Sequence, residues 1–366
     1  GFPFMRQAET FLSSLPFILL LAVFILPCPM SAAAKPRPAI AFVHLLLPPG
    51  GEPHASPAGW IGSLDRARDT LESLRIPTIV SSASPGNAED LNELSEMDPE
   101  VLITTSPLLY AAACDVAKRS PNTVFFACTD ETVHDNMSGF QARTYEAHYL
   151  AGLIAGALSE DGVIGYLAND PYQSKASRLR NANAFTLGAQ KSKAAIRVLY
   201  APGNDPDEEL KTLIAAGADI VDLERALPSL VERLREHSVR YVGTAGRTVD
   251  PLCLAAPEWE WSNAFGDLLT QVRSGIWRPR NVSYGIKEGV VGLSPFGPAV
   301  PETVRVRVRE AKEAIRNGAS PFEGPVRDVS GSLRIAEGSV PDDATLRGMD
   351  WRVQGLEPLP LTPDGR

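Results

Sequence analysis

Several hydroxyl side chains stand where an apolar run gives way to a helical pattern, the position at which parallel-sheet proteins commonly bind small molecules. Thr105 and Ser106 follow the run VLIT and open a helical segment, and Tyr110 lies one turn further along. The first two hydroxyls can bond the polar edge of a ligand, or they can serve only to cap the helix. Tyr110 can stack on or bond a ligand, or it can be half-buried packing. All three are candidate ligand-binding residues.

Two tryptophans at predicted helix starts are candidates for stacking on a flat ligand. Trp60 follows the Pro- and Gly-rich loop 47–57, and Trp259 follows the run LCLAA. Stacking of a base on an aromatic side chain contributes roughly 1–3 kcal/mol. The alternative for each tryptophan is packing against its own lobe. Trp261 falls at helical spacing with Phe265 and further apolar residues, so we predict it to be part of the core.

Signatures of catalysis are missing from the sequence, which has no G-x-S-x-G, H-E-x-x-H, phosphate loop or G-x-G-x-x-G behind a strand. The five histidines show no spacing typical of metal ligands. Cys114, Cys128 and Cys253 form no C-x-x-C pair, and we expect them to be buried thiols, with a Cys114–Cys128 disulfide as an unsupported alternative. We therefore expect no enzyme, no cofactor and no metal.

Short apolar runs alternate with helical patterns along most of the chain, which predicts an α/β fold with parallel sheets covered on both faces. The number of strands favours two sheets rather than one. The predicted strands are 39–44, 76–81, 101–104, 123–127, 163–167, 196–200, 219–223, 239–243 and 252–256. The predicted helices are 60–74, 88–96, 107–118, 144–158, 174–190, 206–216, 227–236 and 258–275.

The first 34 residues have the pattern of an export signal. Residues 17–26 form a short apolar run, and Ala32, Ala33 and Ala34 supply an A-x-A cleavage pattern. Cys28 is an alternative site of lipid attachment, although Pro27 is unusual before such a cysteine. A net charge of −9 and a pI near 5.2 argue against nucleic acid as a partner. We expect a periplasmic or secreted protein, attached to a membrane only through a partner or a lipid.

Residues 141–167 combine a helical pattern with a short apolar strand and carry a G-x-x-x-G at Gly152 and Gly156, for which we predict tight helix packing. This stretch resembles the bacterial basic membrane protein family of solute-binding proteins, which has a similar ARTYE-x-x-YLAG-x-x-AG run before I-G-Y. Further family-like segments follow in order along the chain. They are LITTS (102–106), NAFTLGAQ (183–190), APEWEW (256–261), GVVGLSPFGPAVP (289–301), PFEGPVRD (321–328) and MDWRVQG (349–355).

The resemblance implies a type I periplasmic binding protein fold, in which two lobes close on a ligand and an ABC permease receives it. Residues 35–142 and about 245–290 would form the N-terminal lobe, residues 143–244 and about 291–340 the C-terminal lobe, and 341–366 a C-terminal segment. The resemblance is greatest to the branch that binds purine bases or nucleosides. Tyr145 and Glu146 match the family's R-T-Y-E run and would lie at the first crossing between lobes, beside the hinge or the ligand.

Three predicted strand ends depart from this family pattern, and such loops choose the ligand. Glu224 and Arg225 replace a polar H-x-D-like segment, Arg247 lies where an aspartate-bearing turn is usual, and APGNDP at 201–206 lacks a tryptophan. Arg247 can bind an anionic ligand, can pair with Glu224, or can be a solvated loop charge.

The sequence thus predicts a solute-binding protein of an ABC importer, with a purine base or nucleoside as the ligand. The alternatives are a sensor ectodomain, a binding protein re-specialised for an anionic ligand and, last, a hydrolase. The candidate ligand-binding residues are Trp60, Thr105, Ser106, Tyr110, Tyr145, Glu224, Arg247 and Trp259.

Overall fold

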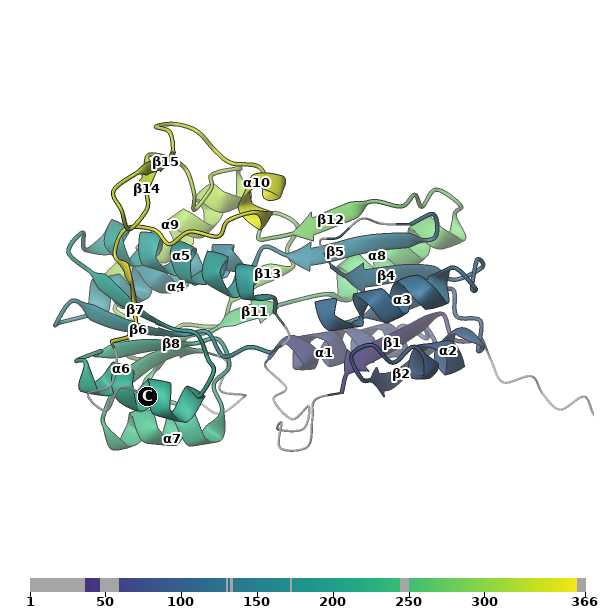
Figure 1. Cartoon of the computed structure of the whole chain (residues 1–366), viewed down its shortest axis with the longest axis horizontal. Coiled ribbons are helices and arrows are strands. Elements are labelled where there is room, and N and C mark those ends of the chain that lie inside the picture. The colour runs from purple at the N-terminus through teal and green to yellow at the C-terminus, as the bar shows by residue number, and fades with distance from the viewer. Residues whose placement is uncertain are drawn as a thin grey trace, which may run out of the picture. The chain divides into compact units, whose positions relative to one another are not determined.

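Two parallel β-sheets, each of six strands, form the framework of the protein (Figure 1). The computed structural model describes residues 37–46, 59–129, 131, 134–171, 173–243 and 250–360. The predicted signal peptide at 1–34, the loop at 47–57 and Arg247 lie outside the described residues. The α/β class predicted from the alternation of apolar runs and helical patterns is confirmed.

The first sheet has the strand order β12-β5-β4-β3-β1-β2, and every neighbouring pair is parallel. Its strands are β1 (Ile40–Leu45), β2 (Thr78–Ala83), β3 (Val101–Thr104), β4 (Val124–Cys128), β5 (Met137–Ala142) and β12 (Asn281–Tyr284). The helices on it are α1 (Trp60–Ser73), α2 (Glu89–Ser95), α3 (Tyr110–Ala117), α8 (Ser262–Arg273) and the short η1 (Pro107–Leu109). Strands β1 and β3 are buried at every position, because helices cover both faces of the sheet.

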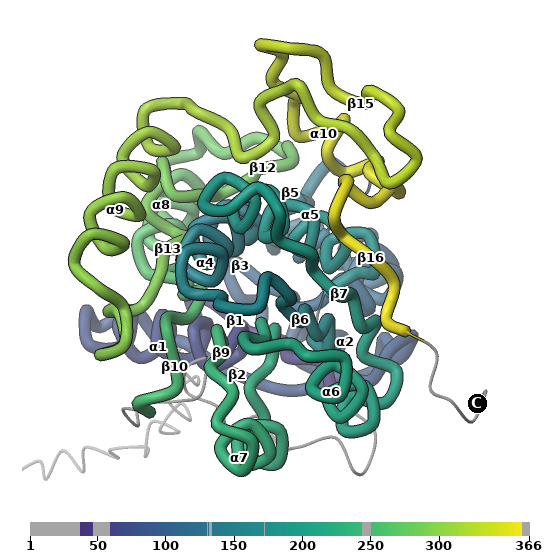
Figure 2. Tube along the Cα trace, turned by 90° about the vertical axis from the view of Figure 1, so that its left-hand side faces the viewer, coloured from purple at the N-terminus to yellow at the C-terminus, as the bar shows by residue number. Residues whose placement is uncertain are grey.

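The second sheet has the order β10-β9-β8-β6-β7-β16 and is also parallel throughout. Its strands are β6 (Val163–Leu167), β7 (Arg197–Ala201), β8 (Ile220–Leu223), β9 (Arg240–Gly243), β10 (Cys253–Ala255) and β16 (Leu356–Pro358). The helices α4 (Thr144–Leu158) and α5 (Lys175–Ser192) lie over one face, and α6 (Pro206–Ala215) and α7 (Pro228–Glu236) over the other (Figures 1 and 2).

The remaining elements connect and cover these sheets. Strands β11 (Pro257–Trp259) and β13 (Val291–Leu293) pair antiparallel, and α9 (Glu302–Arg316) packs against α4. The last elements within the described residues are β14 (Val326–Arg327), β15 (Leu333–Ile335), α10 (Asp343–Arg347) and β16.

All nine predicted strands are present as β1, β2, β3, β4, β6, β7, β8, β9 and β10. The strands β5 and β12 were missed, because MSGFQA and NVSY mix polar and apolar residues and show no continuous apolar run. They become strands by pairing with the sheet, β5 with β4 and β12 with β5.

The allocation of residues to the two lobes differs from the sequence-based division at two strands. Residues 253–255 form β10, which pairs with β9 in the second sheet rather than joining the first. Likewise β16, from the predicted C-terminal segment, pairs with β7 at the edge of the second sheet. The sequence of a short strand carries no local signal for which of two sheets it joins, so the pattern alone could not place either one.

The glycines of the G-x-x-x-G motif lie where α4 and α5 come into backbone contact. A Cβ atom on Gly152 would be 2.1 Å from the Phe185 carbonyl oxygen, and one on Gly156 would be 2.2 Å from the Ala189 oxygen. In return, a Cβ on Gly188 of α5 would meet the Tyr149 oxygen of α4 at 2.1 Å. Only a residue without a side chain allows this approach, which agrees with the predicted tight packing.

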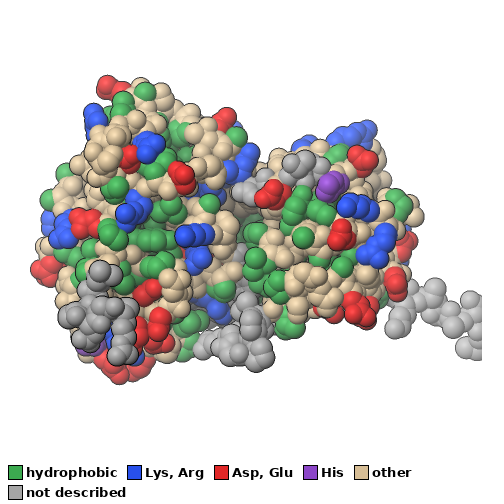
Figure 3. Space-filling model, in the orientation of Figure 1, with side chains coloured by type: hydrophobic (Ala, Val, Ile, Leu, Met, Phe, Trp, Pro, Cys, Tyr) green, Lys and Arg blue, Asp and Glu red, His purple; other side chains and the backbone are tan. Residues whose placement is uncertain are grey.

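Among the described residues, none of the helices is both long and apolar enough to cross a bilayer. On the face shown in Figure 3, Lys and Arg side chains are interspersed with Asp and Glu side chains rather than gathered in one patch.

Replacing Gly152 by alanine should destabilise the protein, because the added methyl group meets a backbone carbonyl that cannot rotate away. We expect a loss of roughly 1–3 kcal/mol in the free energy of unfolding, the range for overpacked sites, measured by chemical denaturation. Gly266→Ala in α8 is the matched control, since a Cβ there meets nothing within 4 Å. That variant should be as stable as the wild type or more so; equal effects of the two substitutions would contradict the close contact.

Candidate functional site

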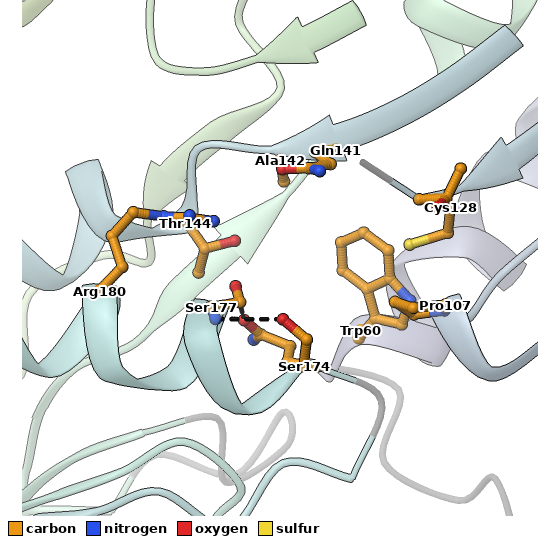
Figure 4. Close-up of a pocket in the computed structure, with 11 residues that line it drawn as sticks. Trp60, Pro107, Cys128, Gln141, Ala142, Thr144, Ser174, Ser177 and Arg180 are labelled. Atoms are coloured by element: carbon orange, nitrogen blue, oxygen red, sulfur yellow. Dashed lines mark hydrogen bonds between the residues drawn. The ribbon is translucent and has the colours of Figure 1, made fainter. Parts of the chain in front are cut away.

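A pocket lies between the carboxyl ends of first-sheet strands and the amino end of α5 (Figure 4). Its open volume, including solvent at the mouth, is about 500 Å³. The residues that line it are Trp60, Pro107, Cys128, Thr129, Gln141, Ala142, Thr144, Gln173, Ser174, Ser177 and Arg180. Among the described residues, the lining combines apolar groups with uncharged hydrogen-bonding groups and one guanidinium, and it contains no carboxylate.

The topology explains why these residues meet. Cys128 ends β4, Gln141 and Ala142 end β5, and Pro107 opens the segment that follows β3. Because parallel strands point the same way, these positions share one edge of the sheet. The opposite wall is the first turn of α5, where the Ser174 side chain caps the helix by accepting a hydrogen bond from the Ser177 N–H at 3.1 Å (Figure 4).

Trp60 is held rigidly in the pocket wall by a cluster of tryptophans. Its indole N–H donates to the Thr105 carbonyl oxygen at 2.8 Å, and its ring meets those of Trp259 and Trp261 edge-on at 5.6 and 5.3 Å. Trp261 is fully buried and stacks on Phe265, so it belongs to the core as predicted. A fixed aromatic ring at the pocket surface can bind a flat ligand at little cost in side-chain entropy.

Trp259 lies behind Trp60 and is not among the lining residues. It is buried, and its indole N–H donates to the Thr144 hydroxyl at 3.1 Å. Trp259 therefore orients Thr144, which does line the pocket, and supports Trp60 from the side.

Thr105 and Ser106 are fully buried, and their hydroxyls serve the protein's own backbone. The Thr105 hydroxyl donates to the Val43 carbonyl oxygen at 3.1 Å, and Ser106 caps η1 by accepting from the Leu108 N–H at 3.3 Å. Neither residue lines the pocket. Tyr110 is half-buried, and its burial and a hydrogen bond with Cys114 raise its pKa to about 12.

The side chains of Asp65, His44 and Thr105 form a row in space behind Trp60, with a carboxylate, an imidazole and a hydroxyl in that order. Asp65 Oδ1 is 3.3 Å from His44 Nε2, and His44 Nδ1 is 3.3 Å from Thr105 Oγ1. The order is that of a catalytic triad, but a nucleophile must reach its substrate. Since the Thr105 hydroxyl is fully buried and donates to Val43, these three groups support the sheet rather than attack a ligand.

Tyr145 borders a smaller pocket next to the first one, together with Gln141, Arg143, Arg180 and α10 residues. Its ring packs against Phe322 at 5.4 Å, and the Arg180 guanidinium lies 5.8 Å from the ring centroid. Arg180 is almost fully buried, donates to the Leu346 carbonyl oxygen at 3.0 Å and lines both pockets. Tyr145 thus positions a residue that faces the ligand site.

Arg143 joins three separate segments at the crossing between the sheets. Its guanidinium contacts Glu146 Oε1 at 3.1 Å, Glu288 Oε2 at 2.6 Å and Asp343 Oδ2 at 3.3 Å. Glu146 in turn accepts from the Ile286 N–H at 2.7 Å. Burial raises the pKa of Glu146, and the nearby Arg143 charge opposes that shift. These contacts tie the start of α4 to the segment after β12 and to α10.

Glu224 belongs to a buried cluster of acidic side chains at the carboxyl ends of second-sheet strands, next to the wall of the pocket that α5 forms. Its carboxylate accepts from the Tyr166 hydroxyl at 2.8 Å and from the Asp170 N–H at 3.4 Å. Nearby, Asp222 Oδ2 lies 3.1 Å from His148 Nδ1, while Asp222 Oδ1 has no hydrogen-bond partner among the described residues. Arg247, the partner considered from the sequence, lies outside those residues.

Protonation within this cluster depends on burial and on neighbouring charges. Burial raises the pKa of Glu224 to about 7, with the His148 charge opposing the shift. Burial alone would lower the pKa of His148, but the adjacent Asp222 carboxylate outweighs it and raises that pKa. Both groups therefore hold a proton more tightly in the folded protein than in the unfolded chain.

The free energy of unfolding should consequently fall as pH rises from about 4.5 to about 7. In that range unfolded chains lose the Glu224 proton while the folded protein keeps it, a difference on the order of 3 kcal/mol. The raised His148 pKa acts in the same direction. Chemical denaturation of the wild type and Glu224→Gln between pH 4.5 and 8 should show a flatter dependence in the variant. The exposed Glu310→Gln is the control, and equal slopes for Glu224→Gln and wild type would contradict this cluster.

Of the residues predicted from the sequence, Trp60 lines the pocket, Tyr145 borders its neighbour and Trp259 supports its wall. The polar wall from α5 was missed. The three residues Ser174, Ser177 and Arg180 follow β6 after a short loop, which is a position where ligands commonly bind in parallel-sheet proteins. They were missed because polar residues are equally common at the solvent-exposed start of an ordinary helix.

Residues 64–215 match the protein family described as ABC transporter substrate-binding protein PnrA-like. A purine-binding protein of Brucella abortus (strain 2308) is 28% identical over 344 residues, which cover 89% of this chain and 95% of the relative. A protein of Haloferax volcanii, named as a candidate glucose-binding protein of an ABC transporter, is 28% identical over 77% of this chain and 78% of its own length.

Solved structures with the same fold include solute-binding proteins of ABC transporter systems. One from Aeropyrum pernix K1 superposes with a TM-score of 0.60 at 16% identity, covering 84% of this chain and 95% of the other. One from Conexibacter woesei superposes with a TM-score of 0.59 at 18% identity, covering 76% and 97%. These similarities establish the type I periplasmic binding protein fold. They do not identify the ligand, which has to be inferred from the residues that line the pocket.

Proposed function

Since the chain belongs to the basic membrane protein family of ABC transporter substrate-binding proteins, we propose that its pocket binds a purine base or nucleoside for import. Proteins of this family act outside the cytoplasm, bind small ligands and work with a membrane permease.

The observation that carries the proposal is the pairing of a fixed indole with several uncharged hydrogen-bonding side chains. Trp60 offers an aromatic surface, while Gln141, Thr144, Ser174 and Ser177 offer hydrogen-bonding groups around it. A purine has the same two features, a flat π-surface and a rim of donors and acceptors. The purine-binding relative, similar over 89% of this chain, supports the same ligand class.

The position of the pocket also suits transport. A ligand that touches Trp60 and Ser177 contacts residues attached to both sheets, so it stabilises whichever arrangement brings both within reach. Binding is thereby linked to movement at the crossing, where Ala142 and Thr144 line the same pocket. The permease then recognises the liganded arrangement.

An anionic ligand is the second candidate, and one residue favours it. Of the described residues that line the pocket, Arg180 carries the one charged side chain, and a guanidinium suits a carboxylate or phosphate. The glucose-binding name of the Haloferax volcanii relative makes sugars a further group to include in any screen.

Mass spectrometry of compounds released from the denatured protein, followed by thermal shifts, tests the choice of ligand. A purine or nucleoside at 100 times its dissociation constant should add about 2.7 kcal/mol of stability. Glucose should give no shift. A stabilising shift with anionic metabolites or sugars alone, and none with any purine, would sink the proposal.

Removing the indole of Trp60 should weaken binding without abolishing it. We expect Trp60→Ala to lower purine affinity roughly 10- to 100-fold, because the variant loses a stacking contribution of about 1–3 kcal/mol. Isothermal titration calorimetry measures the change. Trp277→Ala, at a half-buried tryptophan outside the pocket lining, is the matched control and should bind like the wild type. Equal affinities of Trp60→Ala and wild type would remove Trp60 from the site.

A further inference from the structure

We propose that Gln173 selects the ligand by presenting a single amide N–H donor to the pocket, with Asp170 fixing the orientation of that amide. The ligand accordingly carries a hydrogen-bond acceptor, such as a carbonyl oxygen, at the edge that meets Gln173. This inference rests on the proposed function and extends it from a class of ligand to a choice within the class.

Gln173 stands in the loop between β6 and α5, directly before the capping residue of the helix, and it lines the pocket. Its side chain makes three hydrogen bonds to neighbouring groups. Nε2 donates to Asp170 Oδ2 at 3.1 Å, while Oε1 accepts from the Ser177 hydroxyl at 2.9 Å and from Asn181 Nδ2 at 3.0 Å.

These three bonds determine what Gln173 can offer a ligand. A side-chain amide has two N–H donors and one oxygen with two acceptor sites. Ser177 and Asn181 occupy both acceptor sites, and Asp170 occupies one donor. Among the contacts of the described residues, the capacity that remains to Gln173 is one N–H, so its contribution to recognition is that of a donor.

Two neighbours oppose a turn of the Gln173 amide. Asp170 Oδ2 accepts a hydrogen bond from the Gln173 nitrogen at 3.1 Å, and the Asn181 amide nitrogen can only donate, so it requires the Gln173 oxygen. In the reversed amide, the Gln173 oxygen would face the Asp170 carboxylate and its nitrogen would face the Asn181 amide nitrogen. Asp170 and Asn181 are both buried, so neither unfavourable contact would be relieved by water.

Asp170 is itself held in place from the opposite side. Its backbone N–H donates to Glu224 at 3.4 Å, and Glu224 accepts from the buried Tyr166 hydroxyl. A chain of hydrogen bonds therefore runs from the second sheet through Asp170 to the pocket surface. Asp170 acts as a positioning residue, and Gln173 is the group that meets the ligand.

The Gln173 N–H would discriminate between oxo and amino ligands, because two hydrogen-bond donors cannot pair with each other. A ligand with an amino group opposite Gln173 leaves two buried N–H groups facing each other, whereas a carbonyl oxygen accepts the bond. Sites of this kind discriminate strongly, because the wrong ligand leaves buried polar groups unpaired. Purines supply matched pairs for this comparison: hypoxanthine and adenine differ at carbon 6, and xanthine and guanine differ at carbon 2.

Calorimetric titration of these two pairs against the wild type, Asp170→Asn and Gln173→Ala tests the inference. In the wild type, the oxo member of at least one pair should bind roughly 10- to 100-fold more tightly than the amino member. Asp170→Asn lets the amide adopt both orientations and should reduce that ratio to about threefold or less. Gln173→Ala should reduce it as well, and Asp161→Asn, at the exposed opposite end of β6, should leave the ratio unchanged.

The outcomes separate this inference from the proposed function. If the wild type binds purines but prefers the amino members, or if both Asp170→Asn and Gln173→Ala keep the wild-type ratio, the inference is overturned and the proposed function stands. If no purine binds the wild type, the proposed function fails and the inference fails with it. Because the readout is a ratio of affinities, a general loss of stability in a variant does not imitate the expected result.

Discussion

The backbone contact between α4 and α5 is the constraint on which the site depends. Gly152 and Gly156 of α4 meet the carbonyl oxygens of α5, and Gly188 meets that of Tyr149. The two helices run in the same direction, so the contacts at these glycines also fix the position of the first turn of α4 relative to the first turn of α5. The crossing residues at the start of α4 are thereby placed beside the pocket residues of α5, as the Arg180 contact with the Tyr145 ring shows.

Two groups of charged side chains near the start of this helix pair differ in how their charges are accommodated. At the crossing, the single guanidinium of Arg143 meets three carboxylates from three segments in a partly exposed place. Next to the pocket wall that α5 forms, the carboxylates of Asp222, Glu224 and Asp170 share a buried region with His148. Burial makes full ionisation there costly, so hydrogen bonds and the His148–Asp222 pair together hold that wall in place.

The sequence predicts the framework well, because an apolar run such as IAFVHL in β1 or VLIT in β3 is sufficient to form a buried parallel strand. It predicts less where an element depends on a distant partner, as β12 does on β5. The site divides in the same way. Trp60 stood out as a large aromatic at a helix start, but a hydroxyl such as that of Ser106 has the same local pattern whether it caps a helix or binds a ligand. Ser174 and Arg180 become recognisable only when folding brings α5 opposite Trp60.

We propose that one pocket, with Trp60 on one wall and the first turn of α5 on the other, holds a purine. A crystal structure of the protein with its bound purine tests this binding site. We expect the purine ring within van der Waals distance of the Trp60 indole and hydrogen-bonded to at least one of Gln173, Ser177 and Arg180. A purine bound away from Trp60, or in contact with residues of only one sheet, would contradict it.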